Sequence, residues 1–408
     1  MPEPPTPTTW TRRGVERSSE VPAMAVNLEA PCETRCLMAT GPTIVIAAGG
    51  TGGHIYPGLA LAEAITVMRP DARVEFVGTS KGLESELIPA AGYELHLYDM
   101  VQFAGQGWRK AIVPAALLRS SLQARRILKE LDAGAAVSMG GYSGIPLVVG
   151  ARLARVPSLV HEPGAVPGKA NLLATRFTRN VATSFPQTRF LGVDVRYVGY
   201  PLRGAITTFD RSALRAPSRA AYDLSEGVSM ILVTGGSQGA RSLNELALGL
   251  ARRWAGRNDI RIVLKAGARH HEKVAADLRN NPGRELVELV RYIDRMDQAY
   301  AAADMAVTRA GAGTVAELAV VGLPSVLVPF PYDEHDEQVH NAEPLVESGG
   351  ALLVRDDNAT PEEVGPLLEE RLADPARLDG MRASMRANAK PDAAAHLAAW
   401  ALDLAALR

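Results

Sequence analysis

The sequence predicts an α/β protein with two Rossmann-like domains, each a doubly wound parallel sheet, facing a common cleft. From Thr43 onward, short β-branched apolar runs alternate with longer helical patterns, which is typical of βαβ units. The stretch from Met230 to Leu250 then repeats the strand, glycine turn and helix of Thr43–Ile65, with Gly235 in the place of Gly49. A repeated unit of this kind indicates two similar domains in tandem.

The alternation assigns elements in order along the chain. In the first half we expect strands at 43–48, 73–78 and 135–138, and helices at 54–68, 81–90 and 146–154. In the second half, after the strand and helix of 230–250, we expect strands at 260–265, 304–307 and 325–328, and helices at 269–279 and 313–321.

Changes in composition suggest the domain boundaries. Residues 1–41 are rich in Pro, Thr and charge and lack periodicity, so we expect a disordered extension. The stretch 200–228 loses strand character and gains turn residues. We therefore predict an N-terminal domain at 42–204, a C-terminal domain at 205–388, and a C-terminal helix at 389–408 that packs back on the first domain.

Overall composition excludes several classes of protein. The formal net charge of −1 on 408 residues gives no general attraction to nucleic acid. The two cysteines, Cys32 and Cys36, lack a second pair for a metal site, and their small number is typical of a reducing cytoplasm. No apolar run reaches the length of a membrane span, and VPAMAV is too short for the apolar region of a signal peptide, so we expect none.

The first glycine-rich loop does not match the common nucleotide cradles. A dinucleotide fingerprint requires a third glycine where Ile55 stands, and Glu75 lies in the middle of the next strand rather than at its end. A P-loop requires lysine after its last glycine, whereas Gly53 precedes His54. Two interpretations of this loop remain. It is either a tight turn without a ligand, or a loop whose backbone approaches an anion or a sugar.

A third glycine-rich stretch, RAGAGTVAE at 309–317, opens another helix. Thr314 and Glu317 have the spacing of a capping box, which is a purely structural interpretation. Alternatively, the backbone and Thr314 hold a pyrophosphate while Glu317 accepts from the hydroxyls of a ribose. Because this motif contains no lysine, such a site would bind a nucleotide sugar through the helix dipole and hydrogen bonds.

Taken together, the motifs resemble those of the MurG family, GT-B glycosyltransferases that add N-acetylglucosamine to lipid I in peptidoglycan synthesis. The resemblance rests on GGTGGHIYPGLALA at 49–62, MGGYSG at 139–144, HEPG at 161–164, VGYPLR at 198–203, GGSQGARSLN at 235–244, RAGAGTVAE at 309–317 and EQVHNA at 337–342. It implies a UDP-N-acetylglucosamine donor, lipid I as acceptor, no cofactor or metal, and a peripheral position on the cytoplasmic face of the cell membrane.

The resemblance also implies roles for single residues. Thr51, Gly52 and Gly53 would meet the donor, Arg203 and Ser237 would hold uracil and phosphate, and Ile293 would contact the base through its backbone. The helix that follows the third glycine-rich stretch would bind the donor with its first residues, which are Ala312, Gly313, Thr314, Val315, Ala316 and Glu317. Glu317 would bind the ribose, and Gln338 would bind the sugar hydroxyls.

Three departures from the family pattern bear on activity. Gly164 stands where the family has an asparagine that contacts the donor sugar, GGYSGIP is one residue shorter than usual, and Glu337 replaces Gln or His. We expect poor discrimination between UDP-hexoses, with Asn171 or a water filling the gap beside Gly164. The alternatives are a GT-B transferase with another acceptor, a nucleotide-sugar epimerase, and a non-catalytic relic that binds nucleotide sugars.

Two side chains are candidates for catalysis. Inverting transfer requires a base near the acceptor hydroxyl. His54 at a helix N-terminus should stay neutral near pH 7, because the helix dipole disfavours the imidazolium. Tyr142 is the weaker candidate, for positioning the acceptor, and a histidine that merely satisfies turn backbone is the structural alternative for His54.

Two further stretches allow a structural and a functional interpretation. DEHDEQ at 333–338 mixes carboxylates with His335, but consecutive loop residues rarely converge on one metal ion, so we expect a solvated loop. In 103–129, six basic residues occur without an acid, and Trp108, Ile112, Leu118 and Leu122 could form an apolar stripe flanked by Arg109, Lys110 and Arg119. Such a stripe suits either an anionic membrane surface or packing on the protein's own sheet.

Overall fold

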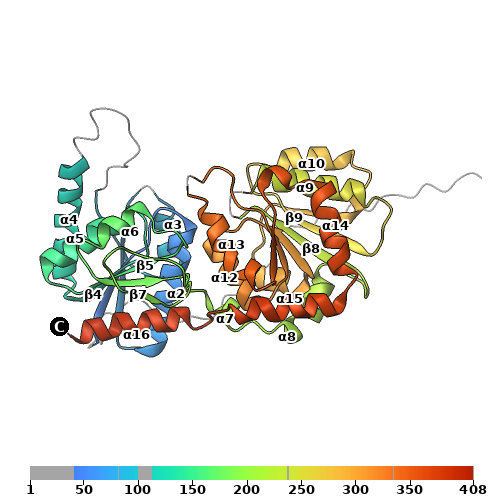
Figure 1. Ribbon diagram of the computed structural model, residues 1–408. Coiled ribbons are helices and arrows are strands. Elements are labelled where there is room, and N and C mark those ends of the chain that lie inside the picture. Colours follow the sequence, from blue (N-terminus) through green and yellow to red (C-terminus); the bar gives the residue numbers. More distant parts are fainter. Residues whose placement is uncertain (1–40, 81, 100–112, 237–238, 334, 408) are drawn as a thin grey trace, which may run out of the picture. The chain divides into compact units, whose positions relative to one another are not determined.

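The structure is a computed structural model that describes residues 41–80, 82–99, 113–236, 239–333 and 335–407 (Figure 1). Within these residues the chain forms two parallel sheets, one of seven strands and one of six. This confirms the predicted fold class. The extension at 1–40 and the basic segment around Trp108 lie outside the described residues.

The first sheet has the strand order β3-β2-β1-β4-β5-β6-β7, and every pairing in it is parallel. Its strands are β1 Thr43–Ala47, β2 Arg73–Gly78, β3 Leu95–Leu97, β4 Ala133–Ser138, β5 Ser158–Glu162, β6 Asn180–Thr183 and β7 Val195–Tyr197. The helices that connect them are α2 Gly52–Met68, α3 Glu84–Ala90, α4 Val113–Glu130, α5 Gly144–Ala154 and α6 Lys169–Ala174.

The second sheet has the order β10-β9-β8-β11-β12-β13, again with parallel pairings. Its strands are β8 Ser229–Thr234, β9 Ile260–Lys265, β10 Val287–Val290, β11 Met305–Thr308, β12 Ser325–Leu327 and β13 Ala351–Leu353. Its helices are α9 Arg241–Arg253, α10 His271–Arg279, α11 Met296–Ala302, α12 Ala312–Val321, α13 Glu337–Glu347, α14 Pro361–Leu372 and α15 Pro375–Ala387, with short 3-10 turns at Arg284–Leu286 and Asp356–Asn358.

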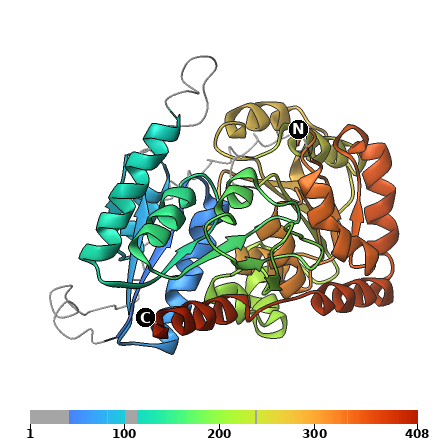
Figure 2. The same ribbon diagram turned by 60° about the vertical axis from the view of Figure 1, so that its left-hand side comes forward.

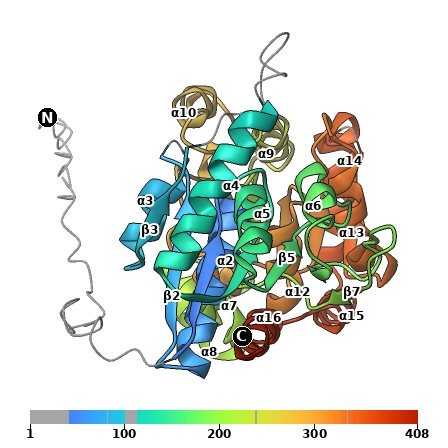
Figure 3. The ribbon, with the colours of Figure 1, turned by 90° about the vertical axis from the view of Figure 1, so that its left-hand side faces the viewer.

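Both faces of the first sheet are covered. Ile44 and Ile46 of β1 belong to a core that includes residues of α2, whereas Val45 and Ala47 belong to a second core with residues of α4 and α5. Alternate residues of a strand point to opposite faces, so this division explains why β1 is an unbroken apolar run. Figure 3 shows α4 and α5 side by side on one face.

The central strands set the position of the candidate site. β1 lies between β2 and β4, and β8 lies between β9 and β11, so the chain changes direction along each sheet at these strands. In open parallel sheets, ligands bind beyond the carboxyl ends of the strands at such switch points. The glycine-rich loops that follow β1 and β8 lie at these positions.

The stretch between the two sheets is helical. It contains α7, Gly204–Thr207, and α8, Arg211–Ala221, whose N-cap Asp210 accepts hydrogen bonds from Ser212 N and Ala213 N. The last helix, α16 (Ala393–Ala406), returns to the first sheet and packs beside α2 (Figure 2). Its buried Leu397 and Ala401 share the core of Ile44 and Ile46.

Candidate functional site

The loop between β1 and α2 is fixed by its glycines and by a buried carboxylate. Gly50 has φ +98°, a left-handed conformation that favours glycine, and its N–H donates to Glu84 Oε2 over 3.1 Å. A Cβ on Gly49 would lie 2.7 Å from Ser143 Oγ. This close packing positions Thr51, the N-cap residue of α2, whose side chain makes no capping hydrogen bond. The Thr51 side chain therefore accepts no hydrogen bond from the first N–H groups of α2.

His54 is the third residue of α2. Its Nδ1 lies 3.2 Å from Thr51 Oγ1, and a Cβ on Gly140 would lie 3.3 Å from its Nε2. Burial lowers its pKa below the usual value, and the helix N-terminus acts in the same direction. The ring is consequently neutral near pH 7. Tyr142 is 47% exposed and directly follows Gly141, on which a Cβ would lie 3.4 Å from His54 Cε1.

The start of α12 differs from the capping-box interpretation. The N-cap is Gly311, Thr314 lies inside the helix, and Glu317 does not cap it, so that interpretation is wrong. Instead, Glu317 Oε2 accepts a hydrogen bond from Tyr300 Oη over 2.7 Å. The remaining predicted cradle, comprising Ala312, Gly313, Val315 and Ala316, lies in the first turns of the same helix.

A lysine that the motif lacks comes from elsewhere in the chain. Lys265, the last residue of β9, is 8% exposed, and its Nζ lies 5.2 Å from the ring centroid of Tyr292. Burial raises the pKa of Glu317, while Tyr300 and the charge of Lys265 lower it; burial also lowers the pKa of Lys265. Sequence reasoning missed Lys265 because no glycine motif marks the end of β9.

Gln338 lies in the first turn of α13 and ties two loops together. Its Oε1 accepts from Ala310 N and from Phe330 N, each over 3.1 Å. Its side-chain oxygen is thus occupied, which leaves the amide N–H groups for a ligand. Nearby, Asn341 Nδ2 donates to Ala310 O, and Asn341 Oδ1 accepts from Ala165 N.

The remaining predicted donor contacts are placed as follows. Arg203 is the N-cap residue of α7, and its guanidinium lies 3.7 Å from Glu63 Oε1 with both side chains about half exposed. Ile293 is 7% exposed and directly follows the exposed Tyr292. Ser237 lies outside the described residues.

Two of the departures from the family pattern lie next to each other. A Cβ on Gly164 would meet Glu337 Oε1 at 2.6 Å, so the Glu337 carboxylate occupies the space beside Gly164. Asn171 does not fill this gap with a free amide, because its Nδ2 donates to His161 O and Glu162 Oε2. Burial raises the pKa of Glu162 to about 7, although three N–H donors favour its carboxylate.

Tyr200 joins the two helix starts, a link that sequence analysis did not predict. Its hydroxyl donates to Gly53 O over 2.8 Å, one residue before His54. A Cβ on Gly313 would lie 3.1 Å from the same hydroxyl. The side chain therefore touches both the loop that carries His54 and the helix that carries Glu317, and the small size of Gly313 allows this approach.

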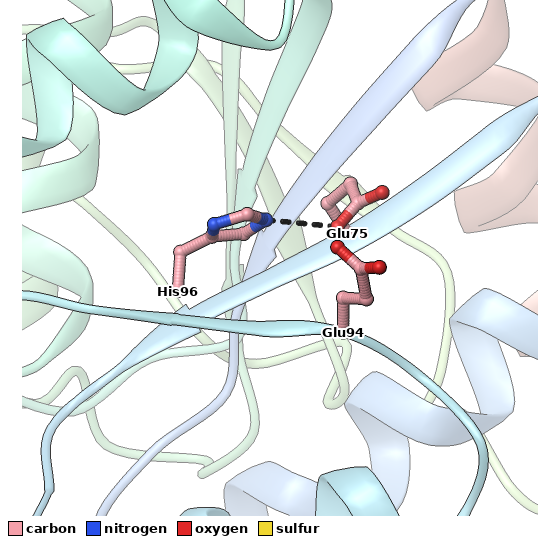
Figure 4. A group of neighbouring side chains, drawn as sticks. All are labelled: Glu75, Glu94 and His96. Carbon is pink, nitrogen blue, oxygen red and sulfur yellow. Dashed lines mark hydrogen bonds and ion pairs between the residues drawn. The ribbon is translucent and has the colours of Figure 1, made fainter. Parts of the chain in front are cut away.

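Among the described residues, only one group of side chains has the spacing of a metal site: Glu75, Glu94 and His96 (Figure 4). His96 of β3 points at Glu75 of β2, and Nε2 and Oε2 are 2.9 Å apart. Glu75 also pairs with Arg73, and Glu75 raises the pKa of His96. The group is thus an ion-paired cluster that spans β2 and β3, and the residues at 333–338 do not form a comparable group within the described chain.

Comparisons with known proteins agree with this geometry. The C-terminal domain of glycosyltransferase family 28 matches residues 230–397, and its N-terminal domain matches residues 44–183. A relative from Saccharopolyspora erythraea is 43% identical over 342 residues, which cover 84% of this chain and 87% of the relative. A relative from Mycolicibacterium vanbaalenii is 40% identical over 370 residues, which cover 89% of this chain and 90% of the relative. Both are called UDP-N-acetylglucosamine--N-acetylmuramyl-(pentapeptide) pyrophosphoryl-undecaprenol N-acetylglucosamine transferase.

Solved structures give the same result. The crystal structure of Acinetobacter baumannii MurG superposes with a TM-score of 0.73 at 28% identity, covering 89% of this chain and 99% of that one. A UDP-N-acetylglucosamine 2-epimerase reaches a TM-score of 0.61 at 11% identity, which reflects the fold alone. On the family domains, the relatives and this structure, the chain belongs to glycosyltransferase family 28 and, within it, to the MurG family.

Proposed function

We propose that this glycosyltransferase transfers N-acetylglucosamine from UDP-N-acetylglucosamine, with inversion, to the muramyl 4-hydroxyl of lipid I, forming lipid II. The observation that carries the proposal is the pair of glycine-rich helices, one with His54 and the other with Glu317. Tyr200 contacts the start of both, because it donates to Gly53 O and lies against Gly313. The names of the relatives supply the donor and the acceptor.

The donor would lie at the start of α12. The diphosphate accepts from the backbone N–H groups of the first turn, where no side chain caps the helix. Glu317 accepts from the ribose hydroxyls, and Lys265 contributes positive charge to the same pocket. Gln338 offers its amide N–H groups to the sugar, while Ile293, Arg203 and Ser237 serve the uracil and phosphate.

The chemical step would use the neutral imidazole of His54. With the ring proton on Nδ1 donated to Thr51 Oγ1, Nε2 is free to act as the base. The acceptor oxygen bonds to C1 of the sugar as the bond from C1 to the UDP oxygen breaks, and the hydroxyl proton passes to Nε2. The electron pair leaves with UDP, whose charge is stabilised by the α12 dipole, while Tyr142 positions the acceptor.

A lipid acceptor requires contact with a membrane surface. On α4, Leu118 and Leu122 are 56% and 49% exposed, and Arg119 and Arg126 flank them. Arg119 is paired with Asp99 over 3.0 Å, which reduces its free charge. Of the predicted stripe, Trp108, Arg109, Lys110 and Ile112 lie outside the described residues. The exposed leucines support contact with a membrane surface rather than packing of this stripe on the sheet, and we propose that this contact lies on the cytoplasmic face.

No described helix combines the length and apolarity needed to cross a bilayer.

The deciding experiment supplies labelled UDP-N-acetylglucosamine with lipid I and follows the label into lipid II. Incorporation that requires both substrates supports the proposal. UDP release or sugar interconversion without an acceptor would instead indicate hydrolysis or epimerisation. Intact UDP binding without any turnover would identify a binding protein.

A further inference from the structure

A cleft lies beside α6. It has a volume of about 1180 Å³ and is lined by Arg152 of α5, by α6 and the segments before and after it, by residues 189–193 and by Asp333, His335 and Glu337. Because Glu337 also touches Gly164, this cleft opens next to the end of the site where the donor sugar is proposed to bind. Neither Glu317 nor Arg203 lines it, so it is distinct from the proposed UDP pocket.

Among the residues that line this cleft are three positively charged arginines, one from α5 and two from the segment after α6. Arg152, Arg176 and Arg179 line it, and all three are exposed. Within the described part of the chain, none of their guanidinium groups makes a hydrogen bond or ion pair. The carboxylates that line the cleft, Asp333 and Glu337, come from the loop before α13 and from its first residue, so an anion would be drawn to the arginines instead.

Apolar side chains line the same cleft as the arginines. Leu172 of α6 is 47% exposed, Phe177 is 36% exposed, and Leu191, between β6 and β7, is fully exposed. Free carboxylates or a soluble phosphate would not require this apolar surface. An anion attached to a hydrocarbon chain satisfies both features, because the guanidinium forks match phosphate oxygens and the apolar side chains cover the chain.

We propose that this cleft binds the diphosphate and the first prenyl units of the lipid-linked acceptor, with Arg176 and Arg179 on the diphosphate and Leu172 and Leu191 on the hydrocarbon. The inference rests on the proposed function and adds to it a binding site for the lipid end of the acceptor. The position also suits the reaction, since a muramyl group attached to a diphosphate here would extend past Glu337 toward the donor sugar.

A direct binding experiment tests the site without catalysis. Farnesyl diphosphate is titrated into the full-length protein, into the double variant Arg176→Gln/Arg179→Gln, and into the control Arg284→Gln, whose exposed arginine pairs with Glu285 away from this cleft. We expect the double variant to bind at least about tenfold more weakly, because charge-assisted hydrogen bonds are lost, while the control is unchanged. UDP affinity should be equal in all three proteins.

Titrations with three ligands, which are farnesyl diphosphate, inorganic pyrophosphate and farnesol, identify the source of the affinity. Inorganic pyrophosphate and farnesol should each bind more weakly than farnesyl diphosphate, because each offers only half of the ligand. Equal affinity for pyrophosphate would reduce the site to one for free diphosphate and overturn the lipid part. Unchanged farnesyl diphosphate binding in the double variant, or its displacement by UDP, would overturn the site.

Transfer kinetics then separate the diphosphate from the peptide of the acceptor. With a short-chain, water-soluble acceptor and no membrane present, the double variant should raise the acceptor KM about tenfold and leave the donor KM unchanged. We expect the same tenfold increase in the acceptor KM for an acceptor with a trimmed peptide. Loss of the effect on trimming would show that the arginines bind the peptide and would sink the proposal. Absence of transfer by the unmodified protein, with arginine-dependent farnesyl diphosphate binding intact, would reject the proposed function alone.

Discussion

The starts of α2 and α12 have the same backbone design and opposite side-chain chemistry. Both follow a glycine-rich loop, both have an extended N-cap residue (Thr51 and Gly311) without a side-chain capping bond, and neither has an acid in its first turn. By contrast, Thr360 caps α14 by accepting from Glu363 N. Helix starts without a side-chain cap and without an acid in the first turn keep N–H groups available for an anionic ligand.

The side chains placed at these two ends differ in a way that suits their proposed tasks. α2 carries an imidazole that burial keeps neutral, whereas α12 carries the Glu317 carboxylate, held by a tyrosine and near a lysine. A neutral base can accept a proton, and a carboxylate can accept hydrogen bonds from sugar hydroxyls. The comparison therefore predicts that chemistry depends on α2 and donor affinity on α12, and each variant below tests this division.

The largest effect is expected for the base. His54→Ala should lower kcat by roughly 10²–10⁴ while UDP affinity stays near normal, because the imidazole acts on the acceptor proton. Single-turnover transfer and calorimetric UDP titration measure the two quantities. His396→Ala, on the exposed face of α16, is the matched control and should be unchanged. A His54→Ala protein that loses UDP affinity as strongly as it loses turnover would contradict the division.

The converse is expected at α12. Glu317→Ala should weaken UDP binding by about 1.5–3 kcal/mol, through loss of hydrogen bonds to a charged group. Glu285→Ala, an exposed glutamate, should leave UDP binding unchanged. Calorimetry at one pH and ionic strength compares the three proteins. If Glu317→Ala binds UDP normally and fails only in turnover, Glu317 does not hold the ribose.

The pH profile sharpens the assignment of the base. Burial lowers the pKa of His54 below 6.5, so the neutral form persists as the pH falls to 6.5 and is lost only below it. We expect kcat/KM to be level from about pH 7 to 6.5 and then to fall about tenfold per pH unit below the lowered pKa. His54→Ala should lack this acid limb. An acid limb centred above pH 7, or one retained in the variant, would assign the titration to another group.

The elements that the sequence predicted well are those with strong local patterns. β1, β8 and β9 are apolar because both faces of their sheets are covered, and their runs mark them clearly. Short strands such as β3 (Leu95–Leu97) and β7 (Val195–Tyr197) were not predicted, since three residues with a central His or Arg show no period. They lie at the two edges of the first sheet, where only one neighbour specifies them.

The site was predictable only in its local parts. The position of His54 at a helix start follows from the glycines before it, and it was predicted correctly. The Thr314–Glu317 spacing misled because α12 begins at Ala312, so Thr314 cannot be its N-cap. The contacts of Glu317 with Tyr300 and of Tyr200 with Gly53 join residues 17 and 147 positions apart, and no local pattern encodes them.

The smallest effect is expected at the link between the two helix starts. Tyr200→Phe removes the hydroxyl that donates to Gly53 O and keeps the ring against Gly313. A neutral hydrogen bond contributes about 0.5–1.5 kcal/mol, so we expect kcat to fall about two- to tenfold because the loop before His54 is less well fixed. UDP affinity should stay unchanged, since α12 keeps its own contacts.

The matched control for Tyr200 is Tyr197→Phe, three residues earlier. The Tyr197 ring lies under Lys390, and within the described residues its hydroxyl makes no hydrogen bond, so its loss should leave kcat unchanged. A purely structural role for Tyr200 would lower the melting temperature and leave turnover per folded molecule intact. If Tyr200→Phe and Tyr197→Phe have equal kcat, the starts of α2 and α12 act independently. A loss of kcat confined to Tyr200→Phe would show that catalysis at α2 depends on a tyrosine that also packs against α12.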